Sequence, residues 1–147
     1  MLRNRIVNGQ KATDATYVAH TDLKRGMGVV KGTAGKTAFT DGEGDSLKLF
    51  VVDRDNLPEG IECMYTDRPD VYFDDIKEGS FVLLRPYVMG ESFYTDQFVA
   101  DAEVDGTNIT AGADGKWCAG GGDVAKFVSR GTETVAGVKM LIVEVVF

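Results

Sequence analysis

Short hydrophobic runs separated by glycine-rich or polar turns follow one another along most of the chain. The runs are rich in valine and aromatic residues, which favour β-strands, and no stretch shows the 3.6-residue spacing of a long amphipathic helix. The pattern predicts strands over eight ranges: Gly28–Lys31, Leu47–Val52, Val71–Phe73, Phe81–Tyr87, Phe93–Ala100, Asn108–Thr110, Val124–Ser129 and Val138–Val146.

The last of these runs differs from the others in being almost continuously apolar, which is typical of a central strand covered on both faces. Asp74–Gly79 is the best candidate for a helix, a single turn that glycine would end. Asparagine or aspartate precedes glycine at four positions, which predicts tight turns there: Asn8-Gly9, Asp41-Gly42, Asp105-Gly106 and Asp114-Gly115.

This pattern predicts an all-β chain, a single β-barrel or β-sandwich domain with very little helix. Residues 1–22 carry little strand or helix patterning, so we expect an extended N-terminal arm followed by a β-barrel domain over residues 23–147. With 147 residues, 44% of them hydrophobic and 27% charged, the chain has enough apolar material to form a core of its own.

The pattern predicts neither membrane insertion nor secretion. The longest purely apolar runs are a few residues long, far below the roughly 20 that a membrane-spanning helix needs. The first ten residues include two arginines but no apolar segment like that of a secretory signal. We therefore expect the protein to stay where it is made, without contact to a membrane.

Candidate chemistry is sparse, and we expect no enzymatic activity, no metal and no cofactor. The two cysteines, Cys63 and Cys118, are far apart in the sequence, and the one histidine, His20, has no second histidine with which to form a metal set. Gly32–Thr37 resembles a phosphate-binding loop, but the leading glycine of that motif would fall on Val30, and no helix is predicted to follow.

The acidic residues leave two weaker alternatives open. Asp101, Glu103 and Asp105 would share one strand face, where a weakly held cation is conceivable beside the simpler prediction of a solvated acidic face. The 23 acidic residues also leave room for a hydrolase that uses two carboxylates, although no pair is singled out.

Charge is distributed unevenly along the chain, whose net charge is −7. Residues 1–36 contain seven basic and two acidic residues, whereas the remainder contains nine basic and 21 acidic ones. The overall negative charge argues against a dedicated nucleic-acid-binding protein, which needs clustered lysine and arginine. A basic leading segment ahead of an acidic body predicts an arm that docks on an acidic surface; an ordinary solvated terminus is the alternative.

The C-terminal third carries the most informative pattern. Ala102–Trp117 includes the segment Ile109-Thr110-Ala111-Gly112-Ala113-Asp114-Gly115-Lys116, and Gly120–Val128 is a glycine-led strand that precedes the long apolar one. This series of turns and strands resembles the small β-barrel decoration, or cement, proteins of tailed-phage capsids. Leu23–Lys31 and Leu49–Asp53 are also similar to such proteins.

The resemblance implies a non-enzymatic virion structural protein that binds the outer surface of an assembled phage capsid and reinforces it. Its partner would be the major capsid protein, it would form a homo-oligomer, and it would be made in the host cytoplasm and located on the capsid exterior. Apolar side chains of the arm would seat in grooves of the shell while basic ones meet carboxylates. The residues expected to bind the partner are Leu2, Arg3, Arg5, Ile6, Val7, Lys11, Tyr17 and Val18.

A carbohydrate-binding β-sandwich is the alternative function. Aromatic side chains could form a platform on which sugar rings stack, although scattered aromatic residues in a β protein are more often part of the core. The candidates are Trp117 and the tyrosines Tyr17, Tyr65, Tyr72, Tyr87 and Tyr94.

Overall fold

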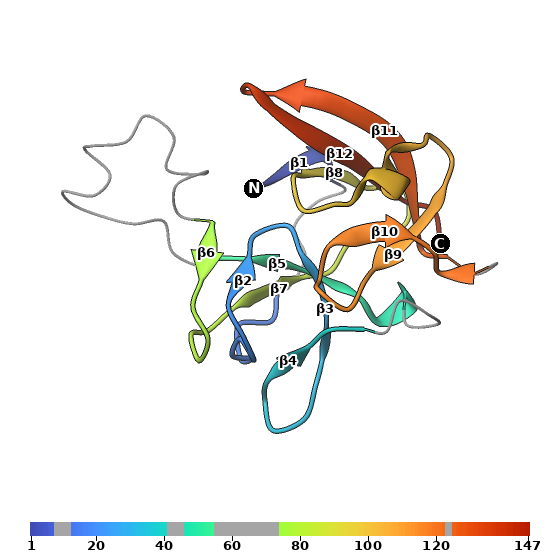
Figure 1. The fold of residues 1–147 in the computed structure, drawn as a ribbon. Helices are drawn as coiled ribbons and strands as arrows, with labels where there is room; N and C mark the ends of the chain where they lie inside the picture. The colour runs from blue at the N-terminus through green and yellow to red at the C-terminus, as the bar shows by residue number, and fades with distance from the viewer. Residues whose placement is uncertain (8–12, 41–45, 55–73, 123–124) are drawn as a thin grey trace.

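The computed structural model describes residues 1–7, 13–40, 46–54, 74–122 and 125–147. Within these ranges the chain is all-β with two short 3-10 helices, which confirms the predicted fold class (Figure 1). The elements are β1 (Leu2–Ile6), β2 (Leu23–Lys24), β3 (Gly28–Lys31), β4 (Thr37–Ala38), η1 (Ser46–Lys48), β5 (Phe50–Asp53), β6 (Asp75–Ile76), β7 (Leu83–Arg85), β8 (Ser92–Thr95), η2 (Ala100–Glu103), β9 (Asn108–Ala111), β10 (Trp117–Ala119), β11 (Phe127–Val135) and β12 (Val138–Val145).

Antiparallel pairing arranges these strands in three sheets. The six-stranded sheet has the order β1-β8-β12-β11-β9-β10, the four-stranded sheet has the order β4-β3-β5-β7, and β2 pairs with β6. In Figure 1 the four-stranded sheet lies below the strands β1, β8, β11 and β12 of the larger sheet. The described sheets do not close into a barrel, so the sandwich is the predicted architecture that fits.

Strand β12 is the predicted central strand and lies between β8 and β11. Its four consecutive residues from Met140 to Val143 are all buried. Because successive side chains of a strand point to opposite faces, both faces of β12 are covered by protein. This prediction is therefore confirmed.

The first hydrophobic core fills the space between the two large sheets. It joins Phe93, Trp117, Phe127 and Leu141 of the six-stranded sheet to Val51 of β5. The rings of Trp117 and Phe127 meet edge to face, with 4.9 Å between their centroids. Such aromatic pairs add about 0.5–1.5 kcal/mol to the stability that their buried area provides.

A second hydrophobic core covers the other face of the four-stranded sheet. Val52 belongs to it together with Leu23, Val29 and Leu84, whereas the preceding Val51 belongs to the first core. Neighbouring residues of β5 enter different cores because their side chains alternate between the faces of the strand. The four-stranded sheet is thus the middle layer of the molecule.

Two hairpin turns have alanine where asparagine or glycine is usual. Ala34-Gly35 connects β3 to β4 with φ of 56° and 70°, and Ala136-Gly137 connects β11 to β12 with φ of 50° and 79°. Positive φ at both central residues is typical of the type I′ turn, whose twist matches that of a hairpin. The predicted turn at Asp114-Gly115 is confirmed between β9 and β10, where Gly115 has a φ of 78°.

Several local predictions are wrong; for example, Leu47 and Lys48 lie in η1, and Ala100 lies in η2, instead of in the predicted strands. Asp75–Ile76 forms the short strand β6 instead of a helical turn, because Ile76 is buried in the second core while β6 pairs with β2. Asp101 and Glu103 lie in η2 and not on a strand. The predicted strand Val71–Phe73 and the turns predicted at residues 8–9 and 41–42 lie outside the described residues.

The described part of residues 1–22, the predicted arm, is extended but lies against the body of the protein. Its first strand pairs with β8, and both Met1 and Leu2 are buried. Further along, Val18 forms β-bridges with Lys36 and Phe81. These residues contribute to the sandwich, so docking through this segment depends on the side chains that remain exposed.

Candidate docking surface

Strand β1 is an edge strand of the six-stranded sheet. One side pairs with β8, with Leu2 opposite Thr95 and Ile6 opposite Ser92, and the register shifts between Asn4 and Ile6. Among the described residues, no strand pairs with the other side of β1. The unpaired N–H and C=O groups of an edge strand can bind an extended segment of a partner.

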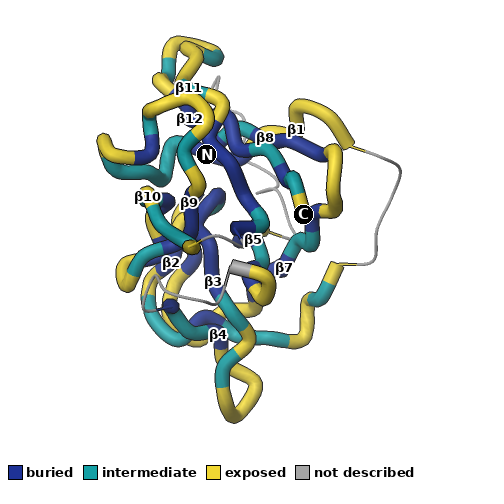
Figure 2. The backbone as a smooth tube through the Cα atoms, turned by 90° about the vertical axis from the view of Figure 1, so that its right-hand side faces the viewer, coloured by how far each residue is buried: buried dark blue, intermediate teal, exposed yellow. Residues whose placement is uncertain are grey.

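Exposed hydrophobic side chains gather where β1 ends. Ile6 lies opposite Ser92, which in turn lies opposite Glu144, so β1, β8 and β12 reach the same end of the sheet together. The five exposed apolar residues at this end, which we call the end surface, are Ile6, Val7, Val88, Met89 and Phe147. Figure 2 shows exposed stretches of chain beside the C-terminus. Several exposed apolar residues at one end of a sheet make this end a candidate for an interaction site.

The turn that carries two of these residues is held by buried polar groups. The Glu91 side chain is completely buried, and its carboxylate accepts a hydrogen bond of 2.9 Å from the Val88 amide. The Tyr87 hydroxyl donates a hydrogen bond of 2.7 Å to Oδ1 of Asn4 on β1. Burial raises the pKa of the Tyr87 phenol, which keeps this donor protonated. The end surface is therefore positioned by the folded body.

The structure separates the eight residues that the sequence predicts to bind a partner. The residues exposed on or directly after β1 are Arg3, Arg5, Ile6 and Val7. Leu2 is buried in the first core, and Tyr17 and Val18 are half-buried next to the second core. Lys11 lies outside the described residues.

Sequence reasoning missed Val88, Met89 and Phe147. The exposed fractions of Met89 and Phe147 are 68% and 63%, among the largest of the hydrophobic residues described. The pair Val88-Met89 directly before Gly90 was a usable signal, because two adjacent apolar residues in a turn have no core face to occupy.

A buried ion pair network joins the middle layer to the segment before β3. Asp53, only 3% exposed, accepts a hydrogen bond of 2.7 Å from Nε of Arg25 and a second one from Nε of Arg85. The same carboxylate also accepts a 2.7 Å hydrogen bond from the next backbone amide in the chain. This carboxylate therefore balances two guanidinium groups at the edge of the first core.

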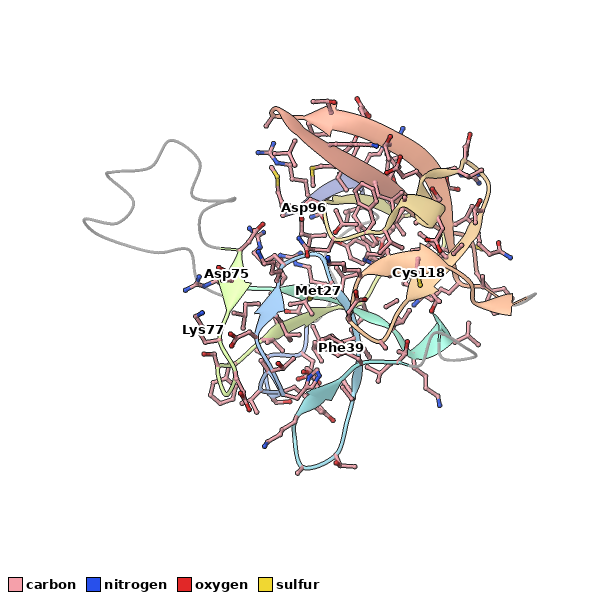
Figure 3. All side chains as sticks on the ribbon, viewed as in Figure 1. Met27, Phe39, Asp75, Lys77, Asp96 and Cys118 are labelled. Carbon is pink, nitrogen blue, oxygen red and sulfur yellow. The ribbon has the colours of Figure 1, made fainter. Side chains whose placement is uncertain are left out.

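The amino group of Met1 continues this network at the start of β1. It donates hydrogen bonds to the Asp96 carboxylate at 2.5 Å and to the Arg25 carbonyl at 3.1 Å, and it pairs with the Asp74 carboxylate. Burial raises the pKa of Asp74, and the neighbouring amino group opposes this shift. Asp96 is labelled in Figure 3 at the six-stranded sheet. The network fastens β1 to the body.

The acidic residues considered for a cation do not converge. Asp101 accepts a hydrogen bond from the Ala119 amide, Glu103 pairs with Lys139 at 2.8 Å, and Asp105 lies 4.0 Å from an arginine. In the part of the chain that the structure describes, no group of three or more His, Cys, Asp or Glu residues could hold a metal ion. Burial raises the pKa of the Cys118 thiol, which disfavours its thiolate.

His20 packs against Phe39, which borders the second hydrophobic core. Its Nδ1 lies 2.8 Å from Oγ1 of Thr37, and its ring meets that of Phe39 edge to face at 4.5 Å between centroids. Burial lowers the pKa of His20, and the charge of Glu78 partly opposes this shift. The surroundings of the imidazole thus favour its neutral form.

We expect this histidine to make stability depend on pH. Because its pKa is below 6.5 in the folded protein, the unfolded chain binds the proton more tightly, and the free energy of unfolding falls as pH drops below about 6.5 until the folded pKa is passed. Urea unfolding from pH 7.5 to 5, compared with His20→Gln, measures this loss. An identical loss in the variant would show that another group causes it.

Trp117 is not available as a platform for sugar rings. The side chain is completely buried, and its Nε1 donates a hydrogen bond of 2.8 Å to the Gly26 carbonyl. Tyr87 is also buried, whereas Tyr17 and Tyr94 are half-buried. The remaining two tyrosines lie outside the described residues. Among the described aromatic residues, Trp117 and Tyr87 are therefore too buried to form such a platform.

Comparison of the chain with protein-family models, with curated proteins and with solved structures gave no match. Among the described residues, no helix has the length and apolar character that crossing a membrane requires.

Proposed function

We propose that this protein is a non-enzymatic virion structural protein that binds the outer surface of an assembled tailed-phage capsid through β1 and the end surface. Its partner is the major capsid protein, and binding reinforces the shell. The observation that carries the proposal is the end surface itself, five exposed apolar residues on or next to β1, β12 and a turn that buried polar groups hold in place. A rigid apolar patch loses little conformational entropy on docking.

The basic residues of β1 make a different protein a better partner for this edge than the β1 strand of a second copy. Two copies of β1 paired in antiparallel fashion would bring Arg3 and Arg5 close to the same residues of the other copy. Like charges at such positions are destabilising, and charged residues on an edge strand are known to prevent its pairing with another edge strand. An acidic segment of the shell complements the positive charge of this strand, so a homo-oligomer of this protein would use another surface.

Co-sedimentation with empty capsids of the phage that encodes the chain tests the proposal. Deleting residues 1–10 is unsuitable, because Met1 and Leu2 are buried and the deletion would disturb the fold. We instead expect Met89→Asp to lower the affinity for capsids about tenfold or more, since a buried interface anchor contributes roughly 2 kcal/mol. Ile6→Asp should have a similar effect.

Phe81→Asp is the matched control. Phe81 is 69% exposed but lies on the four-stranded side of the molecule, next to Val18. Its replacement changes an exposed hydrophobic residue to the same acid without touching the end surface, so capsid binding should be unchanged. Absence of co-sedimentation of the unmodified chain, or equal losses in all three variants, would contradict the proposal. Thermal unfolding of each variant confirms that the fold is intact.

A further inference from the structure

Arg5 is an exposed cation at the border of the end surface. It lies in the register shift of β1, between Asn4 and Ile6, and such an irregularity bends a strand and re-aims a side chain. The residues that follow it, Ile6 and Val7, belong to the end surface and are 49% and 42% exposed. The positive charge of Arg5 therefore lies next to apolar side chains that face solvent.

Nearby arginines interact within the protein, whereas Arg5 does not. Glu144 reaches the same end of the sheet, and its carboxylate accepts a hydrogen bond of 2.9 Å from Nε of Arg130. Arg3 also interacts with another residue of the chain. In the described part of the chain, no residue forms a hydrogen bond or an ion pair with the side chain of Arg5. Its charge is therefore available to a partner.

The charge and the apolar residues together indicate the chemistry of that partner. The five residues of the end surface are uncharged, so the charge at their border comes from Arg5. The protein as a whole has a net charge of −7, which repels an acidic partner at long range. Attraction through Arg5 is therefore short-ranged, and it increases where apolar contacts exclude water from the pair. A segment that fits this surface carries an acidic residue beside a hydrophobic one.

We infer that Arg5 is the specificity-determining residue of this surface, and that the capsid segment which docks there carries an aspartate or glutamate next to a hydrophobic side chain. The inference rests on the proposed function and adds the chemistry of the partner segment. The hydrophobic side chain covers part of the end surface, while the guanidinium group donates hydrogen bonds to the carboxylate. A segment without a carboxylate leaves the guanidinium group partly desolvated and without a counter-charge, which disfavours that segment.

Co-sedimentation with the same empty capsids tests the role of the charge. Arg5→Gln keeps a polar side chain and removes the positive charge. We expect roughly fivefold weaker binding than that of the unmodified chain at about 50 mM salt, and a clearly smaller difference at about 500 mM, because salt screens a charge pair at the rim of an interface. Comparing the two proteins at each salt concentration cancels the effect of salt on the rest of the complex.

Lys36→Gln is the matched control. Lys36 is an exposed lysine directly before β4, and Figures 1 and 2 show β4 at the opposite end of the molecule from β1. The substitution removes the same charge without touching the end surface, so capsid binding should equal that of the unmodified chain at both salt concentrations. Both residues are exposed, so the cores stay intact in both variants, and thermal unfolding checks this.

Zero-length crosslinking identifies the carboxylate itself. Arg5→Lys keeps the positive charge and introduces a primary amine, which a carbodiimide joins to a neighbouring carboxylate as an amide. Mass spectrometry of the crosslinked complex should find position 5 attached to an aspartate or glutamate of the major capsid protein that has a hydrophobic residue beside it. Lys36 in the same sample should give no such product.

The outcomes separate this inference from the proposed function. If Met89→Asp weakens capsid binding but Arg5→Gln does not at either salt concentration, the inference is wrong and the proposed function stands. Equal losses in Arg5→Gln and Lys36→Gln would show an effect of net charge and would also overturn the inference, as would crosslinks from Lys36 alone. An unmodified chain that does not bind capsids contradicts the proposed function, and this inference with it.

Discussion

Replacing Asp53 by asparagine is expected to lower the free energy of unfolding by about 3–5 kcal/mol, the usual cost of removing one partner of a buried ion pair. The substitution keeps the shape of the side chain but removes the charge that balances Arg25 and Arg85. Both guanidinium groups lie partly inside the protein, where solvent cannot fully replace this counter-charge, although Asp74 remains 3.7 Å from Arg25. Urea unfolding at neutral pH, followed by tryptophan fluorescence, measures the loss.

The control is Asp75→Asn, which removes the same charge from an exposed position. Asp75 lies on β6 and pairs with Lys24 at 3.5 Å, and both side chains are more than half exposed. Exposed pairs of this kind contribute at most about 1 kcal/mol. Equal effects of the two substitutions would show that the Asp53 network adds no more stability than a surface ion pair.

The predictable part of the fold is the part whose pattern is local. β3 was predicted with its observed bounds, and the central position of β12 followed from a run of apolar residues without polar alternation. Each signal lies within fewer than ten neighbouring residues. The helical turn at Asp74–Gly79 was wrong because tertiary pairing with β2 outweighs local preference in so short a segment.

The candidate site was only half predictable, because it is assembled from distant segments. Ile6 and Val7 were identified from the sequence, but Val88 and Met89 join them only through the pairing of β1 with β8. Phe147 reaches the same end because β12 pairs with β8. Strand register depends on long-range contacts and on turns such as Ala136-Gly137, whose composition is unusual for its geometry.

Trp117 illustrates the same limit at the level of one side chain. Its burial depends on a gap in the facing sheet, where Gly28 of β3 leaves room for Ala111 and for the indole ring. A Cβ atom at Gly28 would lie 2.6 Å from Cβ of Ala111 and 3.3 Å from Cζ2 of Trp117. No local pattern in the sequence reveals that this glycine is required by a contact between layers.

Gly28→Ala is therefore expected to lower the free energy of unfolding by about 1–3 kcal/mol, the usual cost of inserting a methyl group into a filled core. The atom nearest to the new methyl group belongs to Ala111 and is attached directly to the backbone, so it cannot rotate away. Gly112→Ala is the control, because a Cβ at that position would meet its nearest atoms at the ordinary distance of 3.4 Å.

The double variant Gly28→Ala with Ala111→Gly moves the methyl group from one sheet to the other and separates overpacking from any intrinsic need for glycine at position 28. If the contact with Ala111 causes the loss, the double variant should recover at least half of it, although glycine in β9 itself costs about 0.5–1 kcal/mol. Urea unfolding of the two single variants and the double variant measures the coupling energy. Additive losses would mean that the two residues do not compete for space at this contact between the sheets.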